Sequence, residues 1–183
     1  MSRAPVVRAV SRKPMLRSLA LWLAAASLLG AAQWLSPYSL GYNSTHSLPT
    51  GLYLTKTLAP GEAQVGDIVC FEYHAPEWAA TRRYFPEGSR LCKFLHALPG
   101  TPLVVDEAGL WVGAKVGPRL AEFALKDSQG RPLPSDALKT GPVGGAFAVV
   151  LTPAHKNSLD SRLLGPIPLE QITHKAWPLW TKD

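Results

Sequence analysis

Short runs of apolar residues recur along most of the chain, and segments rich in proline, glycine and polar residues separate them. Such runs are typical of β-strands, and after residue 35 no amphipathic pattern longer than about ten residues predicts a helix. The pattern therefore predicts a mainly β fold, a sandwich or a barrel. The predicted strands are 51–55, 68–73, 91–98, 103–105, 110–112, 145–152 and 173–180.

Three segments interrupt this pattern. Residues 36–44 are polar and rich in turn formers, residues 74–90 mix proline, tryptophan and arginine, and residues 126–141 are rich in glycine and proline. We expect turns and irregular structure in all three. Residues 106–109 separate two short apolar runs and predict the loop of a hairpin.

Residues 18–35 form an uncharged, mostly apolar run that follows five positively charged residues. As a helix rising ~1.5 Å per residue, the run reaches about 27 Å, close to the ~30 Å of a membrane's hydrocarbon core. Positive charges hold their end of such a helix in the cytoplasm. We therefore expect a basic cytoplasmic tail (1–17), a single transmembrane anchor (18–35) and a periplasmic domain (36–183). The alternative is a cleaved signal peptide ending at residues 30–32.

The charge lies almost entirely in this tail. The formal net charge is +6, yet from residue 36 onward the chain holds 14 basic and 13 acidic residues. A nucleic-acid surface would need clustered lysine and arginine on the folded part, which is absent from the sequence pattern. We therefore expect the inner membrane, and no nucleic acid, as a partner.

Two cysteines, Cys70 and Cys92, lie in the part expected outside the cytoplasm. A disulfide is permitted there. The sequence leaves open whether the two form a disulfide or remain two buried thiols.

Three separated segments carry polar residues suited to catalysis. Ser47 lies in a turn fixed by Pro49 and Gly51, and Lys93 is a lone charge within an apolar strand. Taken singly, a serine in a turn or a lysine in a strand is usually an ordinary solvent-exposed residue and not a catalytic one. Burial, however, disfavours the ammonium form and lowers the pKa, which a lysine base requires. The third segment, residues 157–162, contains hydroxyl, carboxylate and guanidinium groups, which would otherwise form a solvated turn with a surface ion pair.

Together the segments resemble the type I signal peptidases. The matching motifs are Ser-x-Pro-x-Gly at 47–51, Gly-Asp-Ile-Val at 66–69, Leu-Pro-Gly at 98–100 and Asn-Ser-x-Asp-Ser-Arg-x-x-Gly-Pro at 157–166. The small size and Asp-Ser-Gln-Gly-Arg-Pro-Leu-Pro at 127–134 resemble the conjugative-transfer signal peptidases of the TraF type. The resemblance implies a signal-peptidase-like β fold after one transmembrane helix.

The resemblance also implies roles for individual residues. Ser47 would be the nucleophile and Lys93 the general base of a Ser–Lys endopeptidase. Ser158 would orient the Lys93 amine, and the Thr45 hydroxyl would contribute to the oxyanion hole beside the Ser47 backbone N–H.

Asp160 and Arg162 would pair and hold the loop that carries the orienting serine. The substrate would be a pilin-like or other conjugative-transfer preprotein, bound as an added strand. Small pockets would favour alanine-like residues before the cleaved bond. The sequence departs from type I enzymes at Phe94 and Thr101, where arginine and aspartate are usual, and the Gly-Asp-Asn-Arg before the last segment is missing.

Alternatives remain open at this stage. His155, near the third segment, is the one serious rival as a base, because His46 and His96 lie on the wrong backbone faces. The histidines and cysteines show no zinc-ligand spacing, so we expect no metal and no cofactor. The function alternatives are a general type I signal peptidase and a non-catalytic anchored component of a secretion or conjugation apparatus.

Overall fold

The computed structural model describes residues 13–59, 61–115 and 117–182, and the chain divides into two compact units after Pro37. The first unit contains helix α1 (Lys13–Leu35), in which the strong helix formers alanine and leucine supply most residues. Among the described residues, no helix combines the length and the apolar character that crossing a membrane requires. The run 18–35 is thus helical, and its predicted transmembrane role is not confirmed.

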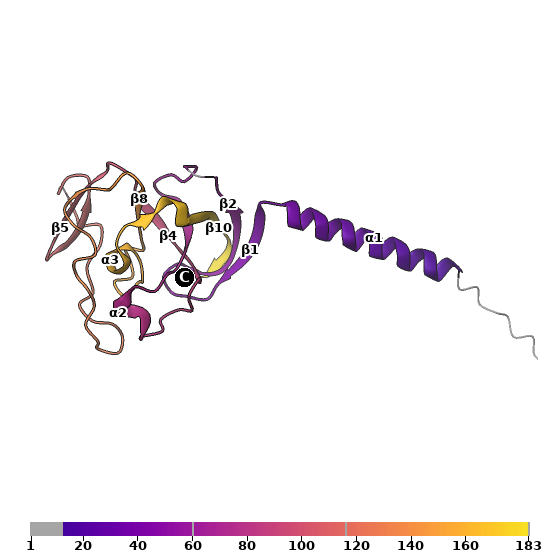
Figure 1. Ribbon diagram of the computed structural model, residues 1–183, viewed down its shortest axis with the longest axis horizontal. Helices are drawn as coiled ribbons and strands as arrows, with labels where there is room; N and C mark the ends of the chain where they lie inside the picture. Colours follow the sequence, from indigo (N-terminus) through magenta and orange to yellow (C-terminus); the bar gives the residue numbers. More distant parts are fainter. Residues whose placement is uncertain (1–12, 60, 116, 183) are drawn as a thin grey trace, which may run out of the picture. The chain divides into compact units, whose positions relative to one another are not determined.

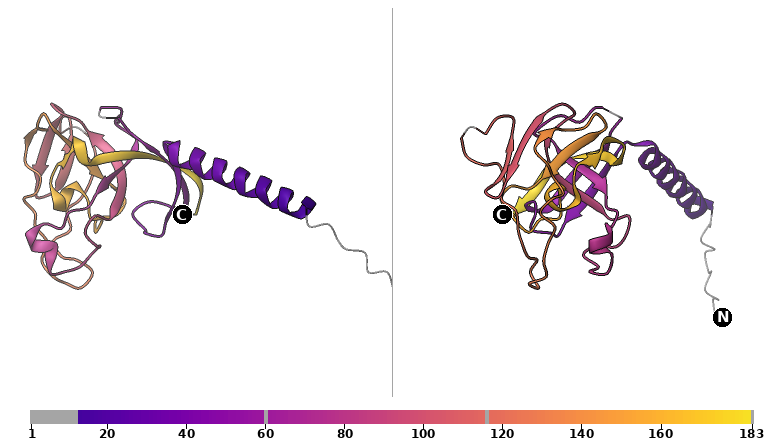
Figure 2. Two further views of the ribbon diagram at one scale, coloured as in Figure 1. Left: turned by 45° about the vertical axis from the view of Figure 1, so that its right-hand side comes forward. Right: turned by 60° about the vertical axis from the view of Figure 1, so that its left-hand side comes forward.

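The second unit is built on a seven-stranded antiparallel sheet in the order β1-β2-β10-β3-β4-β8-β9 (Figure 1). Strand β10, from the end of the chain, lies between β2 and β3 from its first half (Figure 2). The five predicted strands that belong to this sheet are present. Its strands are β1 (Tyr38–Asn43), β2 (Thr50–Thr57), β3 (Ile68–Glu72), β4 (Arg90–Ala97), β8 (Phe147–Leu151), β9 (Ile167–Pro168) and β10 (Ile172–Lys182).

The expectation of turns in residues 36–44 is wrong, because strand β1 occupies most of this segment and pairs with β2. Its alternate residues Tyr38, Leu40 and Tyr42 are exposed, so β1 lacks the buried face that a period-2 pattern would reveal. The strand forms because it lies at the edge of the sheet, where β2 offers an unpaired backbone.

A smaller sheet has the order β6-β5-β7, formed by β5 (Pro102–Asp106), β6 (Gly109–Val112) and β7 (Gly141–Pro142). The predicted hairpin is confirmed. Short helices fill part of the connections: α2 (Glu77–Ala80), α3 (Ser161–Leu164) and the 3-10 helix η1 (Leu169–Gln171). The segments 74–90 and 126–141, which were predicted to be irregular, contain no other helix or strand, apart from the start of β4 at Arg90 and the first residue of β7.

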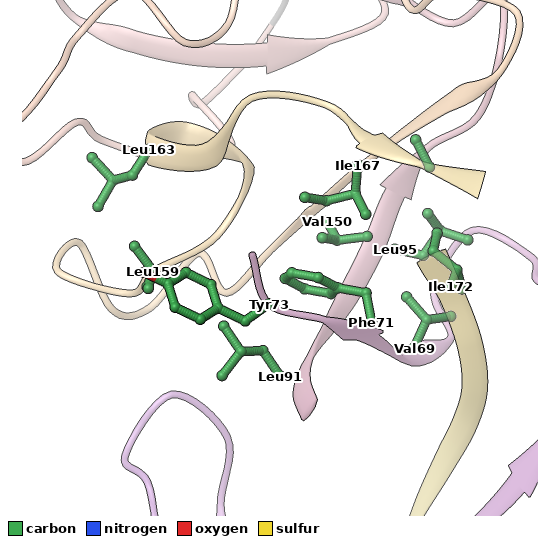
Figure 3. Close-up of a cluster of buried hydrophobic side chains, with 11 residues drawn as sticks. Val69, Phe71, Tyr73, Leu91, Leu95, Val150, Leu159, Leu163, Ile167 and Ile172 are labelled. Carbon is green, nitrogen blue, oxygen red and sulfur yellow. The ribbon is translucent and has the colours of Figure 1, made fainter. Parts of the chain in front are cut away.

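The main core lies between the sheet and α3. Figure 3 shows the rings of Phe71 and Tyr73 among Leu91, Val150 and Leu159, and all five side chains are buried. Alternate residues of β3 and β4 point into this core, as the two-residue period of a strand requires. The packing fixes β4, which carries the candidate base.

Cys70 and Cys92 form a disulfide between facing positions of β3 and β4. The question left open by the sequence is thereby answered. Cys70 packs in a buried cluster with Leu48 and Tyr53, and Leu48 follows Ser47 directly. The two cysteines are separated by 22 positions in the sequence, and a disulfide closing a loop of that length stabilises by about 3 kcal/mol in the chain-entropy model. This disulfide packs next to the turn that carries the candidate nucleophile.

Candidate active site

Ser47 lies in the turn between β1 and β2, and Asn43 at the end of β1 organises that turn. The Asn43 amide nitrogen donates to the carbonyls of Thr45, Leu48 and Pro49, at 2.9, 3.0 and 3.2 Å. Its oxygen accepts from the Thr45 backbone N–H at 3.1 Å and from the Thr45 hydroxyl at 2.7 Å. One side chain thus satisfies five polar groups of a turn that has few backbone partners of its own.

Gly51 closes the turn because β10 passes against it. Its φ is +146°, and a Cβ built there would lie 2.1 Å from the Trp180 carbonyl oxygen. Only glycine fits both the backbone angle and this approach. The glycine of the Ser-x-Pro-x-Gly motif therefore has a structural reason at this position.

Lys93 reaches the turn from the inward face of β4. Its neighbours on that face, Leu91 and Leu95, belong to the core, and Lys93 itself is 4% exposed. The Lys93 Nζ lies 2.7 Å from the Ser47 Oγ. Burial lowers the pKa of Lys93 to about 8, against the opposing attraction of Asp160. A lysine with this pKa is partly neutral near pH 8 and can then accept a proton.

Thr45 stands beside the pair. Its hydroxyl oxygen lies 3.3 Å from the Ser47 Oγ, while its proton is directed to the Asn43 side chain. In this arrangement the Thr45 hydroxyl faces Ser47 as an acceptor. Its predicted part in an oxyanion hole needs a rotation of that hydroxyl away from Asn43, and stays a prediction.

Ser158 lines the same cavity as Ser47 and Lys93. The Ser158 hydroxyl is buried and has no hydrogen-bond partner among the described residues. The predicted hydrogen bond to the Lys93 amine is therefore not formed here. A buried hydroxyl without a partner is costly, and its orienting role remains a prediction.

Asp160 and Arg162 form a buried two-point ion pair below the loop that carries Ser158. The Arg162 Nε donates to Oδ1 at 2.9 Å and Nη2 donates to Oδ2 at 2.8 Å. Arg162 also donates to the carbonyls of Thr152, His155 and Glu122. The predicted pairing is present, and it fixes both ends of the loop 152–160.

The histidine rival to Lys93, His155, lines the same cavity as Ser47 but forms no hydrogen bond with it. His155 is exposed, and among the described residues no hydrogen bond joins Ser47 to a histidine. His96 lies three residues after Lys93 on β4, and so on the other face of the strand. Within residues 13–59, 61–115 and 117–182, no cluster of three or more histidine, cysteine or acidic side chains could bind a metal.

A cavity of about 500 Å³ adjoins the pair of Ser47 and Lys93. Segments 84–85 and 127–133 form part of its wall, and the sequence pattern assigned neither of them to the site. The pattern also did not single out Asn43. An asparagine four residues before a turn serine is the signal that could have indicated the latter, since asparagine commonly caps turns through its side chain.

Residues 13–180 match the signal peptidase family, peptidase S26. The chain belongs to this family. Family membership implies a serine peptidase that acts on preproteins, and the resemblance found in the sequence is confirmed.

The chain is 28% identical over 164 residues to the plasmid transfer protein TraF of Escherichia coli, covering 86% of this chain and 90% of that one. A solved structure, a signal peptidase I from Enterococcus faecalis, aligns with a TM-score of 0.39 and 20% identity, covering 62% of this chain and 96% of that one.

Proposed function

We propose that this S26 signal peptidase cleaves leader or signal peptides from pilin or other conjugative-transfer proteins, with Ser47 as nucleophile and Lys93 as general base. The observation that carries the proposal is the 2.7 Å approach of a buried lysine amine to a turn serine. Among the described residues this amine forms no ion pair with a carboxylate, and a scaffold protein has no use for such a buried amine, because its burial costs free energy.

The mechanism follows from the two side chains. In the resting site the Lys93 ammonium donates to Ser47 Oγ. After it loses a proton, the direction reverses and the Ser47 hydroxyl donates to the neutral amine. Ser47 Oγ then attacks the substrate carbonyl while its proton passes to Nζ, and Nζ returns a proton to the leaving amine. Water, deprotonated by the same amine, hydrolyses the acyl-enzyme and regenerates Ser47.

The substrate class rests on the relative. The name of the Escherichia coli protein places it in plasmid transfer, and residues 127–134 carry the motif typical of that type. A pilin or another transfer protein delivered across the membrane is therefore the proposed substrate.

The test is processing by the full-length chain in membranes. We expect wild type to cleave a pilin-like precursor, Ser47→Ala to leave it uncleaved, and the exposed control Ser135→Ala to cleave normally. Cleavage of a secretory precursor with no cleavage of the pilin would favour a general signal peptidase. Cleavage of neither would favour a non-catalytic component.

Attachment to the inner membrane, with the second unit in the periplasm, belongs to the same proposal. It is supported by the five positive charges before residue 18 and the uncharged run 18–35. Carbonate extraction of membranes tests it. Retention of the full-length chain in the pellet supports a spanning anchor, and release into the supernatant contradicts one.

Asn43→Ala is expected to lower kcat by about 100-fold, with a smaller change in KM, because the variant loses the hydrogen bonds that position Ser47. Asn43→Asp keeps the acceptor oxygen and loses the N–H donors, so its kcat should lie between those of wild type and Asn43→Ala. Ser39→Ala, on the same strand with a hydroxyl paired to Thr55, is the control. Steady-state cleavage decides, and wild-type kcat in Asn43→Ala would contradict the positioning role.

A further inference from the structure

The disulfide between Cys70 and Cys92 lies one residue away from the candidate base. Cys92 directly precedes Lys93 in β4, and Val69, which faces Lys93 across the strand pair, directly precedes Cys70 in β3. Successive side chains of a strand point to opposite faces of the sheet. Lys93 therefore points to the face of the main core, and the disulfide lies on the other face.

The turn that carries the candidate nucleophile is attached to these two strands at two points. The Ser47 Oγ lies 2.7 Å from the Lys93 amine. The next residue, Leu48, belongs to the buried cluster that contains Cys70, and Cys92 packs against that cluster. The disulfide thus joins the strand that carries the base to the surface on which the turn of the nucleophile packs.

Tyr53 connects the same cluster to the end of the turn. Tyr53 is a buried member of the cluster around Cys70. Its hydroxyl donates a hydrogen bond to the Pro49 carbonyl at 2.7 Å. The position of the turn therefore follows the position of the cluster on both sides of Leu48.

The sheet itself does not depend on the disulfide. Strand β3 pairs with β10 and β4, and β4 pairs with β3 and β8, so each strand has a hydrogen-bonded neighbour on both sides. Both strands also contribute residues to the main core. We therefore expect the reduced chain to keep its sheet, and to lose the covalent link that fixes the spacing of β3 and β4 beside Lys93.

Of the two sulfurs, that of Cys92 is the one that a reagent can reach. Cys70 is fully buried, whereas Cys92 is half-buried. Cys92 also lines a second cavity, of about 430 Å³, whose wall includes Asn43, Thr45 and Lys93. The cavity gives a small dithiol a path to the disulfide.

Resting on the proposed function, we propose that Cys70 and Cys92 are positioning residues whose disulfide holds the Lys93 amine at the Ser47 Oγ, so that full cleavage activity requires the oxidised form. Disulfides persist outside the cytoplasm and are kept reduced within it. The second unit therefore gains full activity only after it has left the cytoplasm.

A dithiol reverses the oxidised state in two steps. One thiolate of the dithiol attacks the Cys92 sulfur, the S–S bond breaks, and the Cys70 sulfur leaves as a thiolate that takes up a proton. The second thiolate of the dithiol then attacks the mixed disulfide and releases Cys92, which also takes up a proton. The two protein sulfurs gain two electrons and two protons, and the dithiol is oxidised to its own disulfide.

The first experiment measures kcat and KM of the full-length chain on a cysteine-free pilin-like precursor. The chain is used oxidised, reduced with dithiothreitol, and reoxidised after the dithiothreitol is removed, and titration of free thiols confirms each state. A misplacement of about 1 Å can cost about 100-fold in rate. Because strand pairing limits the movement, we expect reduction to lower kcat by about 10-fold, with a smaller change in KM, and reoxidation to restore it.

A matched variant shows that the disulfide is the target of the reagent. The chain has no cysteine besides Cys70 and Cys92. The double variant Cys70→Ala, Cys92→Ala should therefore have the kcat of the reduced wild type, and dithiothreitol should not change it.

The pH profile separates positioning from stability. Burial lowers the pKa of Lys93 to about 8, and a strand that moves admits water, so this pKa should be higher in the reduced enzyme. The midpoint of the rate profile should rise with it, whereas a smaller folded fraction lowers the apparent kcat and leaves the midpoint unchanged. Thermal melting gives a temperature at which both forms are folded. The other acidic and basic side chains around Lys93 are the same in both forms: Asp160, Arg162, His46, Asp127, His155 and Lys156.

The outcomes separate the two claims. An oxidised wild type that cleaves no precursor overturns the proposed function and the positioning role with it. Cleavage by the oxidised enzyme that reduction leaves unchanged overturns the positioning role and leaves the proposed function standing. A lower kcat with an unchanged midpoint also overturns it, because the disulfide then serves stability alone.

Discussion

Replacing Lys93 with methionine is expected to lower precursor cleavage by about 10⁴-fold or more, the loss seen when a catalytic base is removed from a serine protease. Methionine keeps much of the length and apolar volume of lysine, but it cannot accept the Ser47 proton. Cleavage of a pilin-like precursor by the full-length chain measures the loss.

The same substitution should stabilise the fold. Burial lowers the Lys93 pKa from about 10.5 to about 8, and each pKa unit corresponds to about 1.4 kcal/mol. Because the folded chain binds this proton less tightly than the unfolded chain, a cost of about 3 kcal/mol is fully present below pH 8. The cost disappears as the pH rises from 8 to 10.5. At pH 7, Lys93→Met should therefore raise the free energy of unfolding.

A control variant distinguishes the effect of removing any positive charge from the effect of removing the catalytic base. Lys139 is exposed, so Lys139→Met should leave both cleavage and stability near wild type. Near-wild-type cleavage by Lys93→Met would contradict the assignment of the base. A large fall in its stability would contradict the account of the buried amine.

Arg162→Met is expected to lower the free energy of unfolding by about 3–5 kcal/mol, the usual cost of leaving a buried charge unpaired. Asp160 is fully buried. Arg162 donates both side-chain hydrogen bonds of their ion pair, and it also donates hydrogen bonds to the carbonyls of the loop 152–160. Chemical denaturation of the full-length chain measures the change.

The matched control is Arg119→Met. Arg119 pairs with Glu122 on the surface, where an ion pair contributes about 0–1 kcal/mol. The double variant Asp160→Leu, Arg162→Met should be less destabilised than the sum of the two single variants, because it leaves no charge unpaired. If Arg162→Met and Arg119→Met lower the free energy of unfolding equally, the buried ion pair has no special role in stability.

The strands could be predicted from the sequence wherever one face is buried. In β4 the alternation of core residues around Lys93 gives a clear period, and the structure has the strand within one residue of the predicted bounds. Strand β1 could not be predicted in this way. It is mostly exposed, and its pairing with β2 is a tertiary effect that no local pattern of residues 38–43 reveals.

The candidate site was predictable where a motif exists and unpredictable where distant segments meet. Ser47 and Lys93 come together as the resemblance implied. The contact of segment 82–85 with the loop 127–133, however, could not be predicted, because irregular backbone carries no periodic signal. Asn43 lay inside a segment whose structure was predicted wrongly, which concealed its position at the end of a strand.

The most direct test of a Ser–Lys mechanism is the pH dependence of kcat/KM for precursor cleavage by the full-length chain. The active form holds neutral Lys93, so the rate should rise with pH and level off above a midpoint near 8, the pKa that burial gives this amine. The absence of a rise in rate around pH 8, together with loss of cleavage in His155→Ala, would instead identify a histidine base, and would contradict the assignment of Lys93.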